Sequence, residues 1–457
     1  MPDQPLHAPV RDLIGLLESI GAREERLVHL QRPPARPARH SDWPTWADPD
    51  LVAACARLGI ARPWTHQTEA AESLHAGRHT VISTGTGSGK SLAAWLPALS
   101  DNLTAQSGPD DVPGTGTARA RISAVGRRPT TLYLSPTKAL AADQDACLTR
   151  PTAVQREAGA PAGSLRTVRT ATCDGDTPLA ERDWARARAD IVLTNPDFLH
   201  FSLLPGHERW TRFLRSLRYI VVDECHAYRG ILGAHVALVV RRLLRLARRL
   251  APDSPGPAVL CASATAAEPA LTAARLIGVA PEAVTAVTDD AAPAGERILA
   301  LWQPALRDPR TVWEGPASPG VEAPDPAADA SASDGSGSAG PGALDLAEDP
   351  EQRRSAVVEA AELLVDLLSA GARALVFVRS RRSAEVVAER ARRTLELRLP
   401  SLVDTVAAYR GGYLPEERRA LESDLRRGRL RALATTNALE LGIDVTGLDV
   451  VIIAGWP

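Results

Sequence analysis

Short apolar runs rich in β-branched residues alternate with segments of helical periodicity across residues 46–290. Strands separated by helices are typical of right-handed βαβ units, in which helices cover both faces of a parallel sheet. The pattern therefore predicts an α/β domain. Its expected strands are Thr80–Ser83, Thr131–Ser135, Val168–Thr172, Ile191–Thr194, Tyr219–Val222 and Ala258–Ala262.

A second series of the same kind occupies residues 291–457 and begins with the apolar run Ile298–Trp302. It predicts a second α/β domain. We expect its sheet to be incomplete, because the chain stops at Pro457 directly after a strand. The expected helices are Ser355–Ser369, Ser383–Leu397 and Pro415–Arg427, and the expected strands are Ala374–Val378, Val403–Ala408, Arg431–Thr435 and Val450–Ala454.

Three segments fall outside these patterns. Residues 1–45 contain one possible helix, Val10–Ile20, and a proline- and arginine-rich stretch, which indicates an extended N-terminal lead-in. Residues 101–128 are rich in Gly, Pro, Asp and Thr and are expected to form a surface insertion. Residues 308–350 carry too few apolar side chains to order themselves and are expected to be a disordered insertion.

Composition narrows the class of protein. The net charge of −2 over 457 residues argues against a generally basic nucleic-acid coat protein, although it leaves room for a local basic groove. The five cysteines show no C-x-x-C pair, so neither a zinc site nor a disulfide framework is indicated. No apolar run reaches membrane-spanning length and no leader is evident, which predicts a cytoplasmic protein without a membrane partner.

A glycine-rich segment follows the first predicted strand and leads directly into a helical pattern. Strand, glycine turn and helix start in this order are typical of a phosphate-binding loop, in which backbone N–H groups and the helix N-terminus face an anion. Lys90 would reach the phosphates and the Ser91 hydroxyl would hold Mg²⁺. Lys90 and Lys138 are the only lysines in the chain. The predicted loop is Thr84, Gly85, Thr86, Gly87, Ser88, Gly89, Lys90 and Ser91, with Thr84 where the strict pattern has glycine.

Two carboxylates, Asp223 and Glu224, follow the predicted strand Tyr219–Val222. Asp223 would hold Mg²⁺, mainly through its water shell, and Glu224 would orient and deprotonate an attacking water. Taken alone, such a pair is more often a helix cap or a solvated pair. The phosphate loop in the same domain favours the catalytic interpretation.

These stretches, in this order, resemble the conserved motifs of the superfamily 2 helicases of the DEAD/DEAH type. The segment Thr84–Ser91 resembles motif I of that family. Asp223–His226 resembles motif II, and Ser263–Thr265 resembles motif III. Trp64 and Gln67 resemble the adenine-reading Q motif, with Gln67 on the base and Trp64 as a stacking ring. Pro136–Leu140 resembles motif Ia and Thr194–Asp197 resembles motif Ib. In the second predicted domain, Val376–Ser380 resembles motif IV and Thr435–Asp444 resembles motif V.

The resemblance implies two RecA-like domains, the first holding ATP and Mg²⁺ at residues 46–290 and the second, incomplete, at residues 291–457. It also implies nucleotide contacts from Gly442 and Asp444 and a catalytic or coupling role for His226, with Ser263 and Thr265 coupling nucleotide state to domain closure. Taken in isolation, His226 is explained equally well as a buried histidine satisfied by its neighbours.

The particular residues within three segments resemble those of the mitomycin-repair-factor helicases and, more distantly, those of the large Lhr helicases. These segments are Cys173–Pro178, Tyr409–Tyr413 and Asn437–Asp444. Both groups are 3′-to-5′ DNA translocases, which implies a DNA-repair helicase acting on single-stranded or partly duplex DNA. RNA remains open as the track, because phosphate contacts barely distinguish the two nucleic acids.

By the same resemblance, the nucleic acid would be contacted at its phosphates. The candidate contacts are Thr137, Lys138, Gly175, Thr194, Arg379, Ser380, Arg410, Gly411 and Thr435. For the hydroxyls and glycines, capping a helix or shaping a turn is the structural alternative. The arginine-rich segment Val236–Leu250 is expected to be a solvated helix face rather than part of the track.

The expected function is therefore an ATP-dependent helicase or translocase. The arginine finger of this superfamily lies in motif VI, and the chain ends before that point, so we expect ATP·Mg binding with impaired hydrolysis. An ATP-controlled nucleic-acid-binding module without turnover, or an RNA helicase, are the alternatives.

Overall fold

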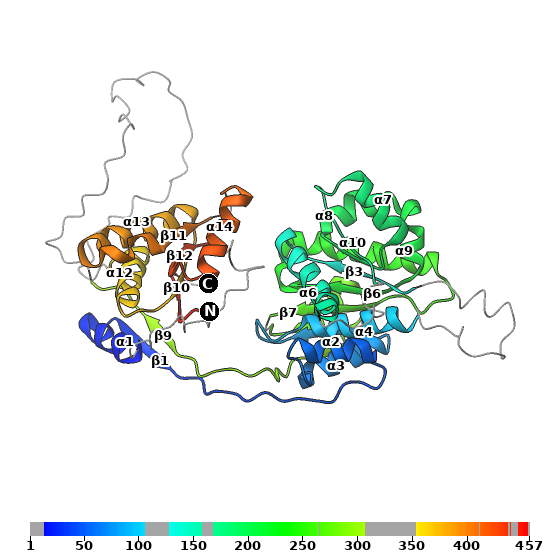
Figure 1. Cartoon of the computed structure of the whole chain (residues 1–457), viewed down its shortest axis with the longest axis horizontal. Helices are drawn as coiled ribbons and strands as arrows, with labels where there is room; N and C mark the ends of the chain where they lie inside the picture. Colours follow the sequence, from blue (N-terminus) through cyan, green and yellow to red (C-terminus); the bar gives the residue numbers. More distant parts are fainter. Residues whose placement is uncertain are drawn as a thin grey trace, which may run out of the picture. The chain divides into compact units, whose positions relative to one another are not determined.

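The computed structural model describes residues 13–105, 128–157, 168–264, 266–306, 353–410, 412–436, 439 and 447–455. The described chain forms two compact units (Figure 1). The first unit comprises residues 33–297. The second unit contains the N-terminal segment up to Arg32 together with the described residues from Ile298 onward.

A seven-stranded, wholly parallel sheet is the framework of the first unit. Its strand order is β4-β5-β3-β6-β7-β2-β8. The strands are β2 (His79–Ser83), β3 (Thr130–Leu134), β4 (Thr170–Cys173), β5 (Ile191–Thr194), β6 (Leu217–Val222), β7 (Ala258–Ser263) and β8 (Val284–Val287). All six predicted strands are present, and the predicted α/β class is confirmed. The seventh strand, β8, was not predicted, because it has only four residues and only the first and last of them are buried.

Helices cover both faces of this sheet. The period-2 alternation of a strand sends neighbouring side chains to opposite faces. Accordingly, Leu132 and Leu134 enter one hydrophobic cluster and Tyr133 enters the other. The first cluster is closed by α7 (Leu179–Arg188), α9 (Thr211–Arg215), α10 (Gly230–Leu250) and α11 (Pro269–Ile277), and the second by α2 (Pro49–Arg57), α3 (Thr65–His75), α4 (Ser91–Thr104) and α6 (Lys138–Glu157).

Shorter helical turns complete the first unit. The one-turn helix α8 (Pro196–Phe198) is followed by a π-helical turn, Leu199–Leu203. Three 3-10 turns, His207–Trp210, Cys225–Ala227 and Pro281–Ala283, connect the remaining elements. Within the part of the chain that the structure describes, no helix is long and apolar enough to cross a membrane.

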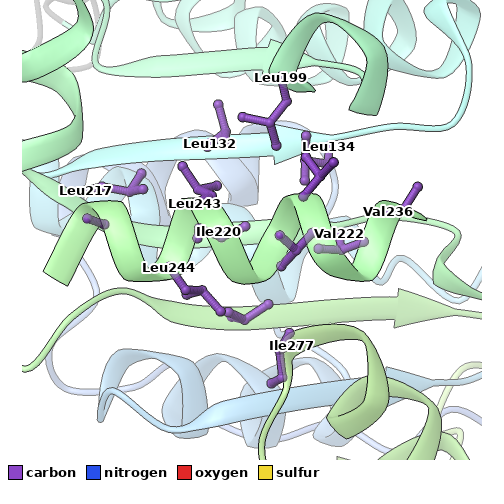
Figure 2. Close-up of a cluster of buried hydrophobic side chains, with 14 of the residues drawn as sticks. Leu132, Leu134, Leu199, Leu217, Ile220, Val222, Val236, Leu243, Leu244 and Ile277 are labelled. Carbon is purple, nitrogen blue, oxygen red and sulfur yellow. The ribbon is translucent and has the colours of Figure 1, made fainter. Parts of the chain in front are cut away.

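Helix α10 illustrates how the sheet is covered. Figure 2 shows Val236, Leu243 and Leu244 of α10 among side chains from strands β3 and β6. Its arginines at positions 242, 245, 248 and 249 are exposed. The predicted solvated arginine face is therefore present, although the helix starts six residues earlier than the predicted segment, at Gly230.

The predicted surface insertion 101–128 begins too early, because residues 101–104 belong to α4. Asp101 lies in the last turns of α4 and accepts hydrogen bonds from Tyr219 (2.5 Å) and the Arg218 guanidinium (2.8 Å). Arg128 forms an ion pair with the buried carboxylate of Asp190 at 3.4 Å. Residues 106–127 of the predicted insertion lie outside the described residues, as does the predicted insertion 308–350.

The second unit contains a four-stranded parallel sheet with the order β11-β12-β10-β13. The predicted strands and helices are present with boundary shifts of a few residues, most of all at β11, whose first expected residues form a 3-10 turn, Pro400–Thr405. The elements are α12 (Ala356–Ser369), β10 (Ala374–Phe377), α13 (Arg381–Arg398), β11 (Val406–Tyr409), α14 (Pro415–Arg426), β12 (Ala432–Thr435) and β13 (Val450–Ile453).

The run Ile298–Trp302 does not belong to the parallel sheet. Its strand β9 (Leu299–Trp302) pairs antiparallel with β1 (Leu27–Gln31), which follows helix α1 (Leu13–Gly21) and a 3-10 turn, Arg23–Glu25. Both Trp302 Nε1, at 2.8 Å, and Arg26, at 3.4 Å, contact the buried carboxylate of Glu359 in α12. Residues 13–32 of the expected N-terminal lead-in thus belong to the second unit, whereas residues 33–45 belong to the first.

The packing of α10 supports a stability prediction. Leu243→Ala should lower the free energy of unfolding by about 2–5 kcal/mol, because a fully buried side chain leaves a cavity between helix and sheet. Leu238→Ala on the same helix is the matched control, since Leu238 is 59% exposed, and it should change the free energy by less than about 0.5 kcal/mol. Urea denaturation followed by tryptophan fluorescence measures both, and equal effects would contradict the assigned packing.

Candidate functional site

The parallel register of the first sheet brings the predicted motifs to one edge. Ser83 at the end of β2 pairs with Ser263 of β7, and Val222 of β6 pairs with Cys261 of β7. The loop after β2, the carboxylates after β6 and the segment after β7 therefore follow neighbouring strand ends. The Ser83 hydroxyl joins two of them, because it donates to Ala264 O at 2.9 Å.

The loop from Thr84 to Lys90 has the backbone that its glycines permit. Gly87 and Gly89 have φ values of +79° and +64°, a region that other residues rarely adopt. The Thr84 side chain is buried, and its hydroxyl lies 2.6 Å from the Ser88 hydroxyl, so this threonine braces the loop from within. Thr86 is exposed at the outer part of the loop.

Lys90 is half-buried at the base of this loop. Its Nζ donates to the carbonyl oxygens of Thr84 (3.1 Å) and Gly85 (3.0 Å). Burial lowers the pKa of the Lys90 ammonium, while the carboxylates of Glu224, Asp223 and Asp290 act in the opposite direction. Helix α4 begins at Ser91, so the N–H groups of its first turn point toward the same place. The arrangement suits a polyanion.

Asp223 is buried beside this cation. Its carboxylate accepts hydrogen bonds from the Tyr133 hydroxyl and from the Glu224 N–H, the latter at 2.9 Å. Burial raises the pKa of Asp223, and the two hydrogen bonds, Lys90 and His226 limit that rise. The Asp223 carboxylate and the half-buried Ser91 hydroxyl are hard oxygen donors at one edge, which fits Mg²⁺.

Tyr133 was not among the predicted site residues. Burial and the neighbouring Asp223 raise its pKa well above the usual range, so the hydroxyl stays protonated and acts as a donor. The signal in the sequence is a single phenol within the otherwise aliphatic centre of β3. It was insufficient, because the contact with Asp223 depends on β3 and β6 being neighbours in the sheet.

Glu224 has a left-handed backbone conformation, with φ 46° and ψ 44°. Such a conformation costs a non-glycine residue about 1–2 kcal/mol and is often found at functional sites. The Glu224 carboxylate lies 3.2 Å from His226 Nδ1. The same nitrogen lies 3.3 Å from the Ser263 hydroxyl, so His226 connects the segment after β6 with the end of β7. Thr265 lies outside the described residues.

The predicted adenine-reading residues lie against the phosphate loop. The Gln67 side chain accepts from the Trp64 N–H and donates to Gly89 O, both at 2.9 Å. A Cβ built on Gly89 would lie 3.2 Å from the Trp64 ring. Both ends of the Gln67 amide are thus bonded to protein, and contact with a base would require Gln67 to exchange one of these bonds.

The nucleic-acid candidates of the first unit gather at the ends of three adjacent strands, β4, β5 and β3. Lys138 is exposed, lies 3.7 Å from the Asp174 carboxylate and donates to Asp176. Thr194 is buried and donates to Cys173 O at 2.6 Å. The Thr137 hydroxyl accepts from the Leu140 N–H, and Gly175 O accepts from Arg182. Of the four candidates, Lys138 alone carries a charge.

The nucleic-acid candidates of the second unit differ in their exposure to solvent. Arg379 and Ser380 are exposed after β10, and Ser380 also caps α13 through the Ser383 N–H at 3.0 Å. Arg410 pairs with Glu385 at 3.1 Å. Thr435 is fully buried and its hydroxyl donates to Thr436 O at 3.0 Å. Gly411, Gly442 and Asp444 lie outside the described residues.

Comparison with known proteins yields matches for both halves of the chain. The DEAD/DEAH box helicase family matches residues 64–273, and the helicase conserved C-terminal domain matches residues 359–457. The uncharacterized ATP-dependent helicase YprA of Bacillus subtilis is 34% identical over 95% of this chain and 48% of its own length. The ATP-dependent helicase HRQ1 of Saccharomyces cerevisiae is 33% identical over 98% of this chain and 35% of its own length.

Solved structures give the same result. The DUF1998 helicase MrfA bound to DNA is 31% identical, with a TM-score of 0.74 over 98% of this chain and 52% of that chain. The Mycobacterium smegmatis helicase Lhr bound to ssDNA and AMP-PNP is 28% identical, with a TM-score of 0.58 over 90% of this chain and 44% of that chain. The chain thus spans about half, or less, of the length of these relatives.

The two matched domains agree with the ordered motifs read from the sequence, and the relatives belong to the branch of helicases that the finer sequence resemblance predicted. The chain belongs to the superfamily 2 helicases, in the branch that contains MrfA and Lhr.

Proposed function

We propose that this chain carries the ATP-driven motor of a helicase or translocase that moves 3′-to-5′ along DNA in DNA repair. One observation carries the proposal: Lys90, Asp223 and Glu224 meet at the carboxyl edge of a single parallel sheet. A cation, a metal-binding carboxylate and a candidate base are the parts that phosphoryl transfer to water requires. The DNA-bound MrfA and Lhr structures support DNA as the track.

In the proposed reaction, the loop from Thr84 to Ser91 holds the triphosphate and Lys90 neutralises its β- and γ-phosphates. Ser91 and Asp223 would hold Mg²⁺, which supplies further positive charge to the phosphate oxygens. The Glu224 carboxylate orients a water and accepts its proton as that water attacks the γ-phosphorus, while the bond from this phosphorus to the β–γ bridging oxygen breaks and ADP leaves with inorganic phosphate as the second product. The contact with His226 at 3.2 Å would position the Glu224 carboxylate for this task.

Nucleic acid would be held mainly by phosphate contacts, so binding would tolerate sequence and weaken with salt. Lys138, Arg379 and Arg410 are the charged contacts that we propose, with uncharged support from Thr137, Gly175 and Thr194. Two alternatives share the same residues: RNA as the track, and a module that binds nucleic acid under ATP control without turnover. ATPase assays with single-stranded DNA, with single-stranded RNA and without nucleic acid distinguish them.

Glu224→Gln should lower nucleic-acid-stimulated ATP turnover by about 10²-fold or more while leaving ATP binding intact, because it removes the proton acceptor but keeps the shape. Phosphate release measures turnover, and equilibrium titration with a fluorescent ATP analogue measures binding. Glu208→Gln, an exposed carboxylate of the same unit, is the matched control. Unchanged turnover in Glu224→Gln would exclude this residue as the base. ATP-dependent DNA retention without turnover in the unmodified chain would favour the binding module.

Asp223→Asn should act in opposite directions on stability and on activity. Burial raises the pKa of Asp223 above the pKa that it has in the unfolded chain, so its ionisation lowers the free energy of unfolding at neutral pH. This loss of stability disappears when the pH falls below the pKa of Asp223 in the unfolded chain. Without Mg²⁺ at pH 7, the neutral amide should therefore raise the unfolding free energy by about 1 kcal/mol and abolish ATP turnover. Thermal melting in a chelator at pH 7 and at pH 4 tests this, since the gain should shrink in acid. A lower melting temperature at pH 7 would contradict the argument.

Asp176→Asn should strengthen DNA binding. Asp176 holds the Lys138 ammonium and adds a negative charge where a phosphate would lie. Because both groups are exposed, the gain should reach at most about fivefold in Kd at low salt and vanish at high salt. Anisotropy of a labelled oligothymidylate measures it. Asp183→Asn is the matched control, because Asp183 pairs with Arg186 on α7. An equal gain in both variants would mean that only net charge is involved.

A further inference from the structure

Two segments bring the chain into and out of the first unit, and they are bound to each other. Residues 33–40 and 288–297 run antiparallel, with Arg36 and Ala294 exchanging backbone hydrogen bonds of 2.8 and 2.9 Å. The Arg39 N–H donates to Ala291 O at 2.9 Å, and the Arg297 N–H donates to Pro33 O at 3.3 Å. We call this pair of segments the strap. It is not part of either parallel sheet (Figure 1).

The strap contacts the phosphate loop through Asp290. Strand β8 pairs with β2 so that Val287 lies opposite Ile82, and three residues further on Asp290 lies beside Gly85. The Gly85 N–H donates to Asp290 Oδ2 at 3.2 Å. A Cβ built on Gly85 would lie 3.1 Å from the same oxygen, so the loop backbone and the carboxylate are in direct contact.

Arg36, from the other segment of the strap, neutralises this carboxylate. Its Nη2 lies 2.9 Å from Asp290 Oδ2, and its Nε donates to Ala292 O at 3.1 Å. Burial acts against ionisation of Asp290, but hydrogen bonds from the Ala292 N–H, Arg36 and the Gly85 N–H hold its pKa below the usual range. Asp290 is therefore an anion at neutral pH, with a cation bound to it.

A second connection runs through His66. Its ring is fully buried, Nε2 donates to Ser88 O at 2.9 Å, and Nδ1 accepts from the Ala291 N–H at 3.0 Å. Burial lowers the pKa of His66, so the ring is neutral and can accept at one nitrogen while donating at the other. The strap is thus bonded to the phosphate loop at two places, one next to Gly85 and one at Ser88.

We propose that Arg36 and Asp290 form a positioning pair that sets the affinity of the phosphate loop for nucleotide. Asp290 fixes the Gly85 N–H, but a lone carboxylate beside the loop would repel a triphosphate. Arg36 removes that repulsion without occupying the loop. The inference rests on the proposed function, because it requires the loop to bind a nucleoside triphosphate.

A double-mutant cycle tests the pair. The readout is the equilibrium Kd of the full 457-residue chain for a fluorescent ATP analogue with Mg²⁺. Arg36→Gln should raise Kd by about fivefold or more, a coupling of the size found between contacting residues. Arg36→Lys should stay within about twofold of the unmodified chain, because the charge remains. Asp290→Asn added to Arg36→Gln should restore Kd to within about twofold, because the uncompensated anion is gone.

The neighbouring pair on the same strap provides the matched control. Arg39 binds Asp289 through two hydrogen bonds of 2.8 and 2.5 Å, and no hydrogen bond of either side chain to the phosphate loop is found among the described residues. Arg39→Gln and Asp289→Asn should leave Kd within about twofold. Additive effects of Arg36→Gln and Asp290→Asn, or equal effects of the Arg36 and Arg39 variants, would overturn the inference. Absence of nucleotide binding by the unmodified chain would instead refute the proposed function.

Discussion

The hydrogen-bond register of the seven-stranded sheet is the constraint on which the site depends. All its strands are parallel, so their carboxyl ends lie at one edge, where loops far apart in the sequence come together. Leu134 pairs with Val222, which places Tyr133 where its hydroxyl meets Asp223. A shift of one residue would turn Tyr133 to the opposite face and expose its hydrophobic neighbours. The same pairing therefore secures both the core and the chemistry.

The edge is also where the unit accepts unfavourable local energies. Lys90 loses hydration, Asp223 is held as a buried carboxylate, and Glu224 occupies a left-handed conformation. Part of these costs is compensated within the site, because the Lys90 ammonium and the Asp223 carboxylate attract each other. The rest is offset by the two hydrophobic clusters on the faces of the sheet. At such a site the fold is less stable, but the charged groups are already positioned before a ligand binds.

Sequence reasoning succeeded where the signal is local. Runs of β-branched residues predicted the strands, and the glycine spacing predicted the loop at Lys90. It failed where the answer depends on which strands are neighbours. Strand β9 resembles any other apolar strand, and its partner β1 lies more than 260 residues earlier. Tyr133, His66 and Asp290 each contact the site through a side chain that comes from a separate element of the chain.

The strap explains why a carboxylate belongs beside a loop that recognises anions. A backbone N–H in a partly buried turn needs a hydrogen-bond acceptor, and Asp290, three residues beyond the end of β8, supplies one to Gly85. Any acidic side chain would do so at the expense of phosphate affinity. Arg36 resolves the conflict, because it pairs with the same carboxylate oxygen, Oδ2, that accepts from Gly85, while the Arg36 backbone is hydrogen-bonded to Ala294. The geometry of the loop and the path of both linking segments are therefore determined together.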